Sequence, residues 1–177
     1  MRSVIVKATL AATLMGAGLG VGPASAAGWH DVHERWAPYV ESALTLPAAR
    51  YCGTFDLKSE PVIQDIRVKV LQRWDNGKPR QEKYVGPLIV RVTNLSTGAS
   101  SHQNLSGHAT VLYRADGTME SYEMNGPVGM GFPAGSDGLS QGFYRLTGHH
   151  LVTFDADGTR HLALDHGAEL NLCNVVG

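Results

Sequence analysis

Short runs of alternating apolar and polar residues recur along this chain, and each ends at a turn that contains glycine. The runs are 66–74, 88–93, 111–114 and 151–154, and the turns after them contain Gly77, Gly98, Gly117 and Gly158. Alternation with a period of two predicts β-strands, and glycine adopts the positive φ that tight hairpin turns demand. The pattern therefore predicts an all-β domain built from consecutive antiparallel hairpins.

Two of these hairpins resemble each other in sequence. Residues 107–118 align with residues 148–159 at a constant offset of 41, and seven of the twelve positions are identical. Gly126 and Gly167 keep the same offset further along the chain. One extra copy is too few for a solenoid or a propeller, so we interpret the repeat as two hairpins that use the same turn geometry within one meander.

The first 26 residues have the pattern of a bacterial-type signal peptide. Arg2 precedes an apolar run, and the small residues Ala24, Ser25 and Ala26 close the segment. This order of regions predicts cleavage after Ala26, with Ala27 as the second choice, and an uncleaved N-terminal anchor as the alternative. We expect a secreted, extracellular protein with no stable insertion into a membrane after cleavage.

Charge argues against one class of partner. Without residues 1–26 the chain of 177 residues keeps 151, and the loss of Arg2 and Lys7 reduces 15 basic residues to 13 against 16 acidic ones, a formal charge of −3. Binding to nucleic-acid phosphates requires clustered lysine and arginine, and no such cluster occurs. We therefore expect no nucleic-acid partner.

The two cysteines of the chain, Cys52 and Cys173, predict one disulfide, because an isolated pair usually bridges in an oxidising compartment. Both lie in strand-like sequence, at 51–55 and 169–173. A bridge would bring their α-carbons to within about 6 Å and so join the first and last strands. A sheet whose ends meet in this way is a barrel or a tightly closed sandwich.

The segment before the β-rich region has a different pattern. Within 28–49, Asp31 and Glu34 have the spacing of a capping box, and Val32, Trp36 and Tyr39 fall on one helical face, although Pro38 argues against a single straight helix. We predict short helical turns in an N-terminal segment 27–49, followed by a β-barrel domain 50–177. A flexible leader is the alternative.

Residues 125–142 contain six glycines and two prolines and so predict a long loop. The loop is either a simple connection or a cover over the mouth of a pocket, in which Met130 and Phe132 contact a ligand. Tyr113 and Trp74, on predicted strands, complete the candidate ligand-binding set.

The histidines offer a weak catalytic hypothesis and no metal site. His149 and His150 are adjacent, so on a strand they point to opposite faces and cannot share an ion. If Asp155 lies across from Thr159, the hairpin register places His149 opposite Asp165, where the two could act as general base and orienting acid. A hydrogen-bonded surface pair is the alternative, and no nucleophile can be assigned beside it.

Gly53-Thr54-Phe55, the meander and the C-terminal cysteine are together similar in outline to calycin-type barrels such as lipocalins and avidins. The tryptophan that lipocalins have in that motif is absent, and no biotin-site residue can be matched. We predict a small closed antiparallel barrel of about eight strands that binds a small hydrophobic or amphipathic ligand without a cofactor. An isomerase- or cyclase-type enzyme using His149 and Asp165, or a surface-acting inhibitor or structural protein, are the alternatives, and the sequence leaves the oligomeric state open.

Overall fold

The computed structural model describes residues 27–177, so the predicted signal peptide and its cleavage after Ala26 lie outside the described residues. The strands are β1 Trp29–Asp31, β2 Ala37–Tyr39, β3 Leu44–Leu46, β4 Leu57–Gln64, β5 Ile66–Trp74, β6 Pro79–Val85, β7 Leu88–Asn94, β8 Ser100–Asn104, β9 His108–Tyr113, β10 Met119–Asn125, β11 Val128–Phe132, β12 Gly142–Phe154 and β13 Arg160–Asn171. A 3-10 turn covers Ala48–Arg50, and a single short helix, α1, covers Cys173–Val176.

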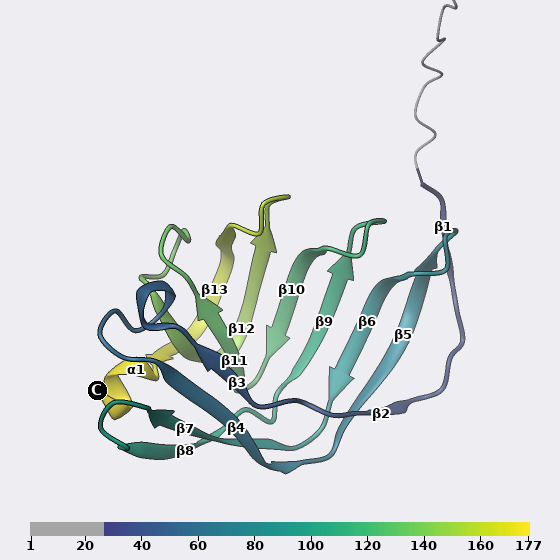
Figure 1. Ribbon diagram of the computed structural model, residues 1–177. Coiled ribbons are helices and arrows are strands. Elements are labelled where there is room, and N and C mark those ends of the chain that lie inside the picture. The colour runs from purple at the N-terminus through teal and green to yellow at the C-terminus, as the bar shows by residue number, and fades with distance from the viewer. Residues whose placement is uncertain (1–26) are drawn as a thin grey trace, which may run out of the picture.

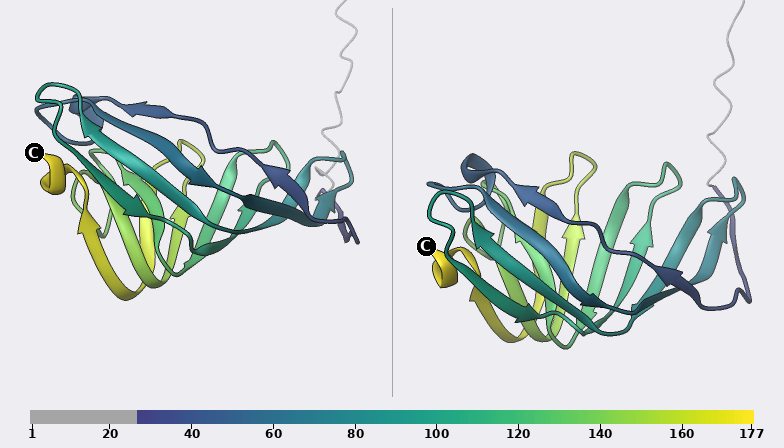
Figure 2. Two further views of the ribbon diagram at one scale, coloured as in Figure 1. Left: turned by 90° about the horizontal axis from the view of Figure 1, so that it is seen from below. Right: turned by 60° about the horizontal axis from the view of Figure 1, so that its bottom comes forward.

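The strands form two sheets (Figure 1). Sheet A has nine strands in the order β1-β5-β6-β9-β10-β12-β11, with β2 also paired to β5 and β13 to β12. Sheet B has four strands in the order β3-β4-β7-β8 and crosses one face of sheet A (Figure 2). Every pairing in both sheets is antiparallel, as the hairpin pattern of the sequence predicts.

Neighbouring strands of the two sheets are the halves of single bent strands. Only Asp65 separates β4 from β5, only Gly86 and Pro87 separate β6 from β7, and residues 105–107 separate β8 from β9. The strand β10 also continues into β11, but both of these lie in sheet A. One half of each of the first three long strands lies in sheet B, and the other half lies in sheet A. The chain is therefore one meander whose strands all bend at about the same level.

Glycines permit this bend. Gly148 on β12 pairs with Gly167 on β13, and Gly148 has a φ of +106°. A Cβ atom on Gly167 would overlap the carbonyl oxygen of Thr147. The N–H of Gly126 donates to the carbonyl of Gly148 at 3.0 Å, which continues the line of glycines onto the next strand. The glycines at the offset of 41 thus include residues that allow neighbouring backbones to approach closely.

The predicted N-terminal helix is wrong. The segment from Trp29 to Leu46 is extended and forms a broken edge strand, in which β1 and β2 pair with β5, and β3 pairs with β4. Pro38 lies within β2, where a missing N–H is tolerated because the strand is at the sheet edge. Pairing with an otherwise open edge satisfies more backbone groups here than one isolated helical turn would.

The disulfide between Cys52 and Cys173 is present, with a Cα–Cα distance of 5.4 Å. The closed barrel deduced from it, together with the calycin-like outline, is wrong. Cys52 lies in a turn before β4, and Cys173 is the first residue of α1, so the bridge joins two connecting segments instead of two strands. Among residues 27–177 no ladder joins β13 to sheet B or β8 to β11, and both sheets are open.

The buried apolar residues form two clusters. The first lies between sheet B, α1 and the start of β12, and it includes Leu57, Val90, Val92, Phe143, Leu172 and Val176. The second lies within sheet A, on β9 to β12, and it includes Ala109, Met124, Phe132, Tyr144, Leu146 and Val152. Because Phe143 and Tyr144 point to opposite faces of β12, this strand contributes to both clusters.

Candidate functional site

A cavity of about 480 Å³ lies between the two sheets. Residues of sheet B, residues of sheet A, and Glu41 and Ser42 of the segment between β2 and β3 all contribute to its wall. Much of that wall is apolar and includes Leu46, Val90, Leu105, Val111, Val128 and Met130. The space between the two sheets is therefore a partly open pocket with a largely apolar wall.

Tyrosine is the most prominent polar residue of this wall. Five of the six tyrosines of the chain line the cavity: Tyr39, Tyr51, Tyr84, Tyr113 and Tyr122. The rings of Tyr39 and Tyr84 meet edge to face, with centroids 5.2 Å apart and planes at 84°. These two rings meet where β2 pairs with the start of β5, next to β6.

Glu82 connects two of the tyrosines. The Tyr84 hydroxyl donates to Glu82 Oε2 at 2.5 Å, and the Tyr113 hydroxyl donates to the same oxygen at 3.0 Å. Glu82 and Tyr84 share a face of β6 because they are two residues apart, and the β6–β9 register places Glu82 opposite Val111, two residues from Tyr113. Strand periodicity thus gathers a carboxylate and two hydroxyls at one point of sheet A.

Burial changes the acid–base behaviour of this cluster. Desolvation, followed by the hydrogen bond to Glu82, raises the pKa of Tyr84 far above its usual value of 10. Desolvation also raises the pKa of Tyr113 to about 12, and it raises the pKa values of Tyr122 and Tyr39. The pKa of Glu41 is raised by burial as well. The tyrosine hydroxyls therefore remain protonated throughout the neutral range, and those of Tyr84 and Tyr113 donate to Glu82.

Of the four predicted ligand-binding residues, Tyr113 and Met130 line the cavity, and Met130 belongs to β11 within the predicted loop. Trp74 does not line the cavity; its indole N–H donates to the carbonyl of Tyr113 at 3.0 Å. Phe132 is fully buried and packs edge-on against Tyr144, with ring centroids 5.7 Å apart. Tyr84 and Glu82 were not among the predicted site residues, although the alternation of residues within 79–85 would have placed both on one face of a strand.

His149 and Asp165 do not face each other. The predicted register holds where Thr153 pairs with His161, but it shifts between Leu151 and Val152, so that Asp165 pairs with His150 and His149 pairs with His166. The shift is a β-bulge at Ala163, an extra residue that sequence counting cannot detect. His149 Nε2 instead lies 2.8 Å from Glu123 Oε1 on the exposed face of sheet A.

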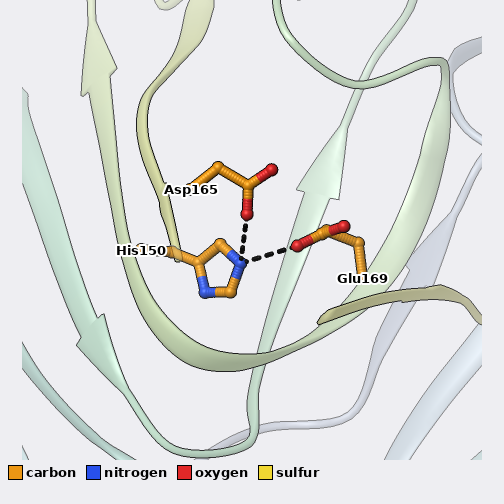
Figure 3. Close-up of side chains that lie close together, drawn as sticks. All are labelled: His150, Asp165 and Glu169. Carbon is orange, nitrogen blue, oxygen red and sulfur yellow. Dashed lines mark hydrogen bonds and ion pairs between the residues drawn. The ribbon is translucent and has the colours of Figure 1, made fainter. Parts of the chain in front are cut away.

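His150 lies between two carboxylates (Figure 3). Its Nε2 atom is 3.1 Å from Asp165 Oδ1 and 2.9 Å from Glu169 Oε1, and its side chain is fully buried. The three side chains offer ligand atoms within 4.8 Å of one another. Among the described residues, they therefore form a candidate site for a metal ion.

The second ring nitrogen of His150 argues against a metal in this position. Metal-bound histidines usually donate their other N–H to an acceptor, whereas the buried Nδ1 atom of His150 has no partner among residues 27–177. An Nε2–H group directed between Asp165 and Glu169 accounts for both contacts without a metal ion. We therefore regard this cluster as an anchor that holds β13 against β12.

Among the described residues, no helix has the length and apolar character needed to cross a membrane. No protein-family model, curated protein or solved structure matches this chain.

Proposed function

We propose that the protein binds a small hydrophobic or amphipathic molecule in the cavity between its two sheets. The observation that carries the proposal is the cavity itself: its volume of about 480 Å³ falls within the range of roughly 300–1,000 Å³ typical of small-molecule sites. The pocket is partly open, so its apolar wall meets water, and a bound apolar ligand would remove that surface from water at a gain in free energy.

The composition of the wall favours a ligand with an apolar body. Leu46, Val90 and Val111 offer aliphatic surface, while Tyr84 and Tyr113 offer hydroxyls in fixed positions. A few fixed polar groups in an apolar wall orient a ligand without requiring it to be highly polar. The signal-peptide pattern and the disulfide support a site of action outside the cell, where the protein would capture or carry its ligand.

The first test is native mass spectrometry of the mature protein, purified from the culture supernatant of its own source organism, before and after denaturation. A small molecule that is lost on unfolding would support the proposal and identify the ligand class. A bare chain that also fails to bind the neutral apolar fluorophore N-phenyl-1-naphthylamine would contradict it.

A pair of variants locates the binding site. Val111 points into the cavity, whereas the neighbouring Thr110 lies on the opposite face of β9. We expect Val111→Phe to fill the cavity and abolish binding of the fluorophore, and Thr110→Phe to retain it. Circular dichroism of both variants shows whether they are folded.

A further inference from the structure

We infer that the aromatic and acidic part of the cavity binds the positively charged amino group of an amphipathic ligand, so that the ligand is a cationic amphiphile. This inference rests on the proposed function and names the chemical class of its ligand. It follows from the charges, the hydrogen-bond directions and the aromatic rings on one side of the cavity wall.

Two carboxylates in this region have no cationic partner. No lysine, arginine or histidine of the described residues forms an ion pair with Glu41 or Glu82. Glu41 lines the cavity, and the pKa values of Tyr39 and Tyr122 are raised in part by its charge, so it belongs to the same cluster as the tyrosines. Carboxylates near an apolar cavity are stabilised when a cation enters it.

The basic residues near Glu82 have other partners. Arg80 lies two residues away on β6, where it hydrogen-bonds to Gln72 and lies over the rings of Trp29 and Trp74 at 4.3 and 5.4 Å. Arg73 pairs with Glu34 at 2.7 Å. The negative charges of Glu41 and Glu82 therefore remain available to a cationic ligand.

The hydrogen bonds of the tyrosines also favour a ligand whose head group donates hydrogen bonds. Tyr84 and Tyr113 use their hydroxyl hydrogens on Glu82, so their oxygen lone pairs are the groups that remain for a ligand. An anionic head group would need donors and would meet acceptors and two carboxylates instead. An ammonium group would donate to these oxygens and contact the faces of the surrounding rings.

The opposite side of the cavity has a different character. Arg160 enters the wall there from β13, but its guanidinium donates to the carbonyl of Gly131 and also contacts Met130 Sδ. His108, the other basic residue of the wall, lies exposed at the start of β9. The strands β9, β10 and β12 lie between β6, which carries Tyr84, and β13, which carries Arg160, so the apolar body of the ligand would lie between the acidic side and Arg160.

Isothermal titration calorimetry with three ligands of equal chain length tests the inference. The probes are decylammonium, decanol and decanoate, each kept below the concentration at which it aggregates. We expect the ammonium compound to bind at least about tenfold more tightly than decanol, and decanoate to bind most weakly, because one charge-assisted contact contributes about that factor. Equal affinities, or tightest binding of decanoate, would overturn the inference but leave the proposed function intact. Failure of all three to bind would contradict the proposed function itself.

Variants of single residues identify the carboxylates that bind the ammonium group. We expect Glu82→Gln and Glu41→Gln each to weaken the binding of decylammonium about tenfold and to change the binding of decanol little. Glu123→Gln is the matched control, because Glu123 lies on the exposed face of the same sheet and contacts His149. If Glu123→Gln weakened the ammonium compound as much as the other two, the attraction would come from overall charge and not from this site. Because the comparison of the three ligands uses the unmodified protein, the inference stays testable even if Glu82→Gln does not fold.

Discussion

The two halves of the bent strands differ in what they pack against. The half that contains sheet B, α1 and the start of β12, here called the closed half, buries Leu57, Val92 and Leu172 completely. The other half, here called the open half, continues some of the same strands into sheet A, where Glu82 and Tyr84 line or adjoin a cavity. The same strands therefore contribute to an apolar core at one end and to one wall of the cavity at the other. The disulfide restrains the closed half, whereas no disulfide joins the strands of the open half among the described residues.

The largest expected effect concerns the disulfide, which belongs to the closed half. Replacing Cys52 and Cys173 together by serine frees two positions that are 121 residues apart. The loss of chain restraint corresponds to about 4 kcal/mol of unfolding free energy. Urea denaturation measures the loss, and hydrogen exchange should show α1 and the turn around Cys52 opening first. If β5 and β6 opened before α1 in this variant, the disulfide would not be what restrains the closed half.

Truncating one apolar side chain in each half sharpens the comparison. Leu57→Ala removes a fully buried side chain in the closed half and should cost about 3 kcal/mol. Val111→Ala enlarges a space that already exists and should cost only about 1 kcal/mol, since Val111 has cavity on one side. Equal losses in urea denaturation would mean that the wall around Val111 is as tightly packed as the closed half.

The bend that separates the halves can be tested at Gly148. Alanine there would have to adopt a φ of +106° and would overlap the carbonyl oxygen of His166, which together should cost about 2–3 kcal/mol. Gly158→Ala is the control, because Gly158 also has a positive φ, of +86°, but no atom lies within 4 Å of a Cβ placed there. It should cost about 1 kcal/mol. If both variants had the same denaturation midpoint, close approach at the bend would be unimportant.

Adjacent histidines allow a smaller test within the open half. His150→Ala leaves Asp165 and Glu169 facing a void without their shared donor and should cost about 1–2 kcal/mol. His149→Ala removes only an exposed contact with Glu123 and should cost about 0.5 kcal/mol or less. Thermal unfolding compares the two variants, and a reversed order would contradict the anchoring role of His150.

The last expected effect, the titration of the cavity tyrosines, produces no change near neutral pH and appears only in alkaline solution. Because the pKa of Tyr113 rises from 10 in the unfolded chain to about 12 in the folded protein, its contribution to stability is complete below pH 10 and disappears as the pH rises through 12. The near-ultraviolet absorbance of tyrosinate should show a group of tyrosines that ionise late, and unfolding in urea should return them to about 10. Ionisation of all six near pH 10 in the folded state would contradict the buried cluster.

Local pattern made part of this fold predictable. Alternation identified the strand from Ile66 to Trp74, and Gly77 and Gly117 marked hairpin turns, in which both adopt positive φ. The disulfide followed from the number of cysteines. These features depend on neighbouring residues or on simple chemistry, so one sequence contains enough information to infer them.

Features that depend on distant residues were not predictable in this way. Closure of the sheet could not be inferred from the disulfide, because Cys52 and Cys173 lie outside strands. A single bulge at Ala163 was sufficient to exchange His149 for His150 as the partner of Asp165. The tyrosine wall is formed by residues of β2, β6, β9 and β10, and it becomes visible only when the register between these strands is known.

The meander also has a consequence for how the chain reaches this structure. Each long strand pairs with the one that precedes or follows it in the sequence, so the hairpins can form one after another, and each step closes only a short loop at small cost in entropy. Contact between the two ends of the chain, which brings Cys52 to Cys173, can then come late, when the intervening strands have already shortened the distance. Oxidation of the cysteines would thus secure a finished arrangement instead of directing the search for it.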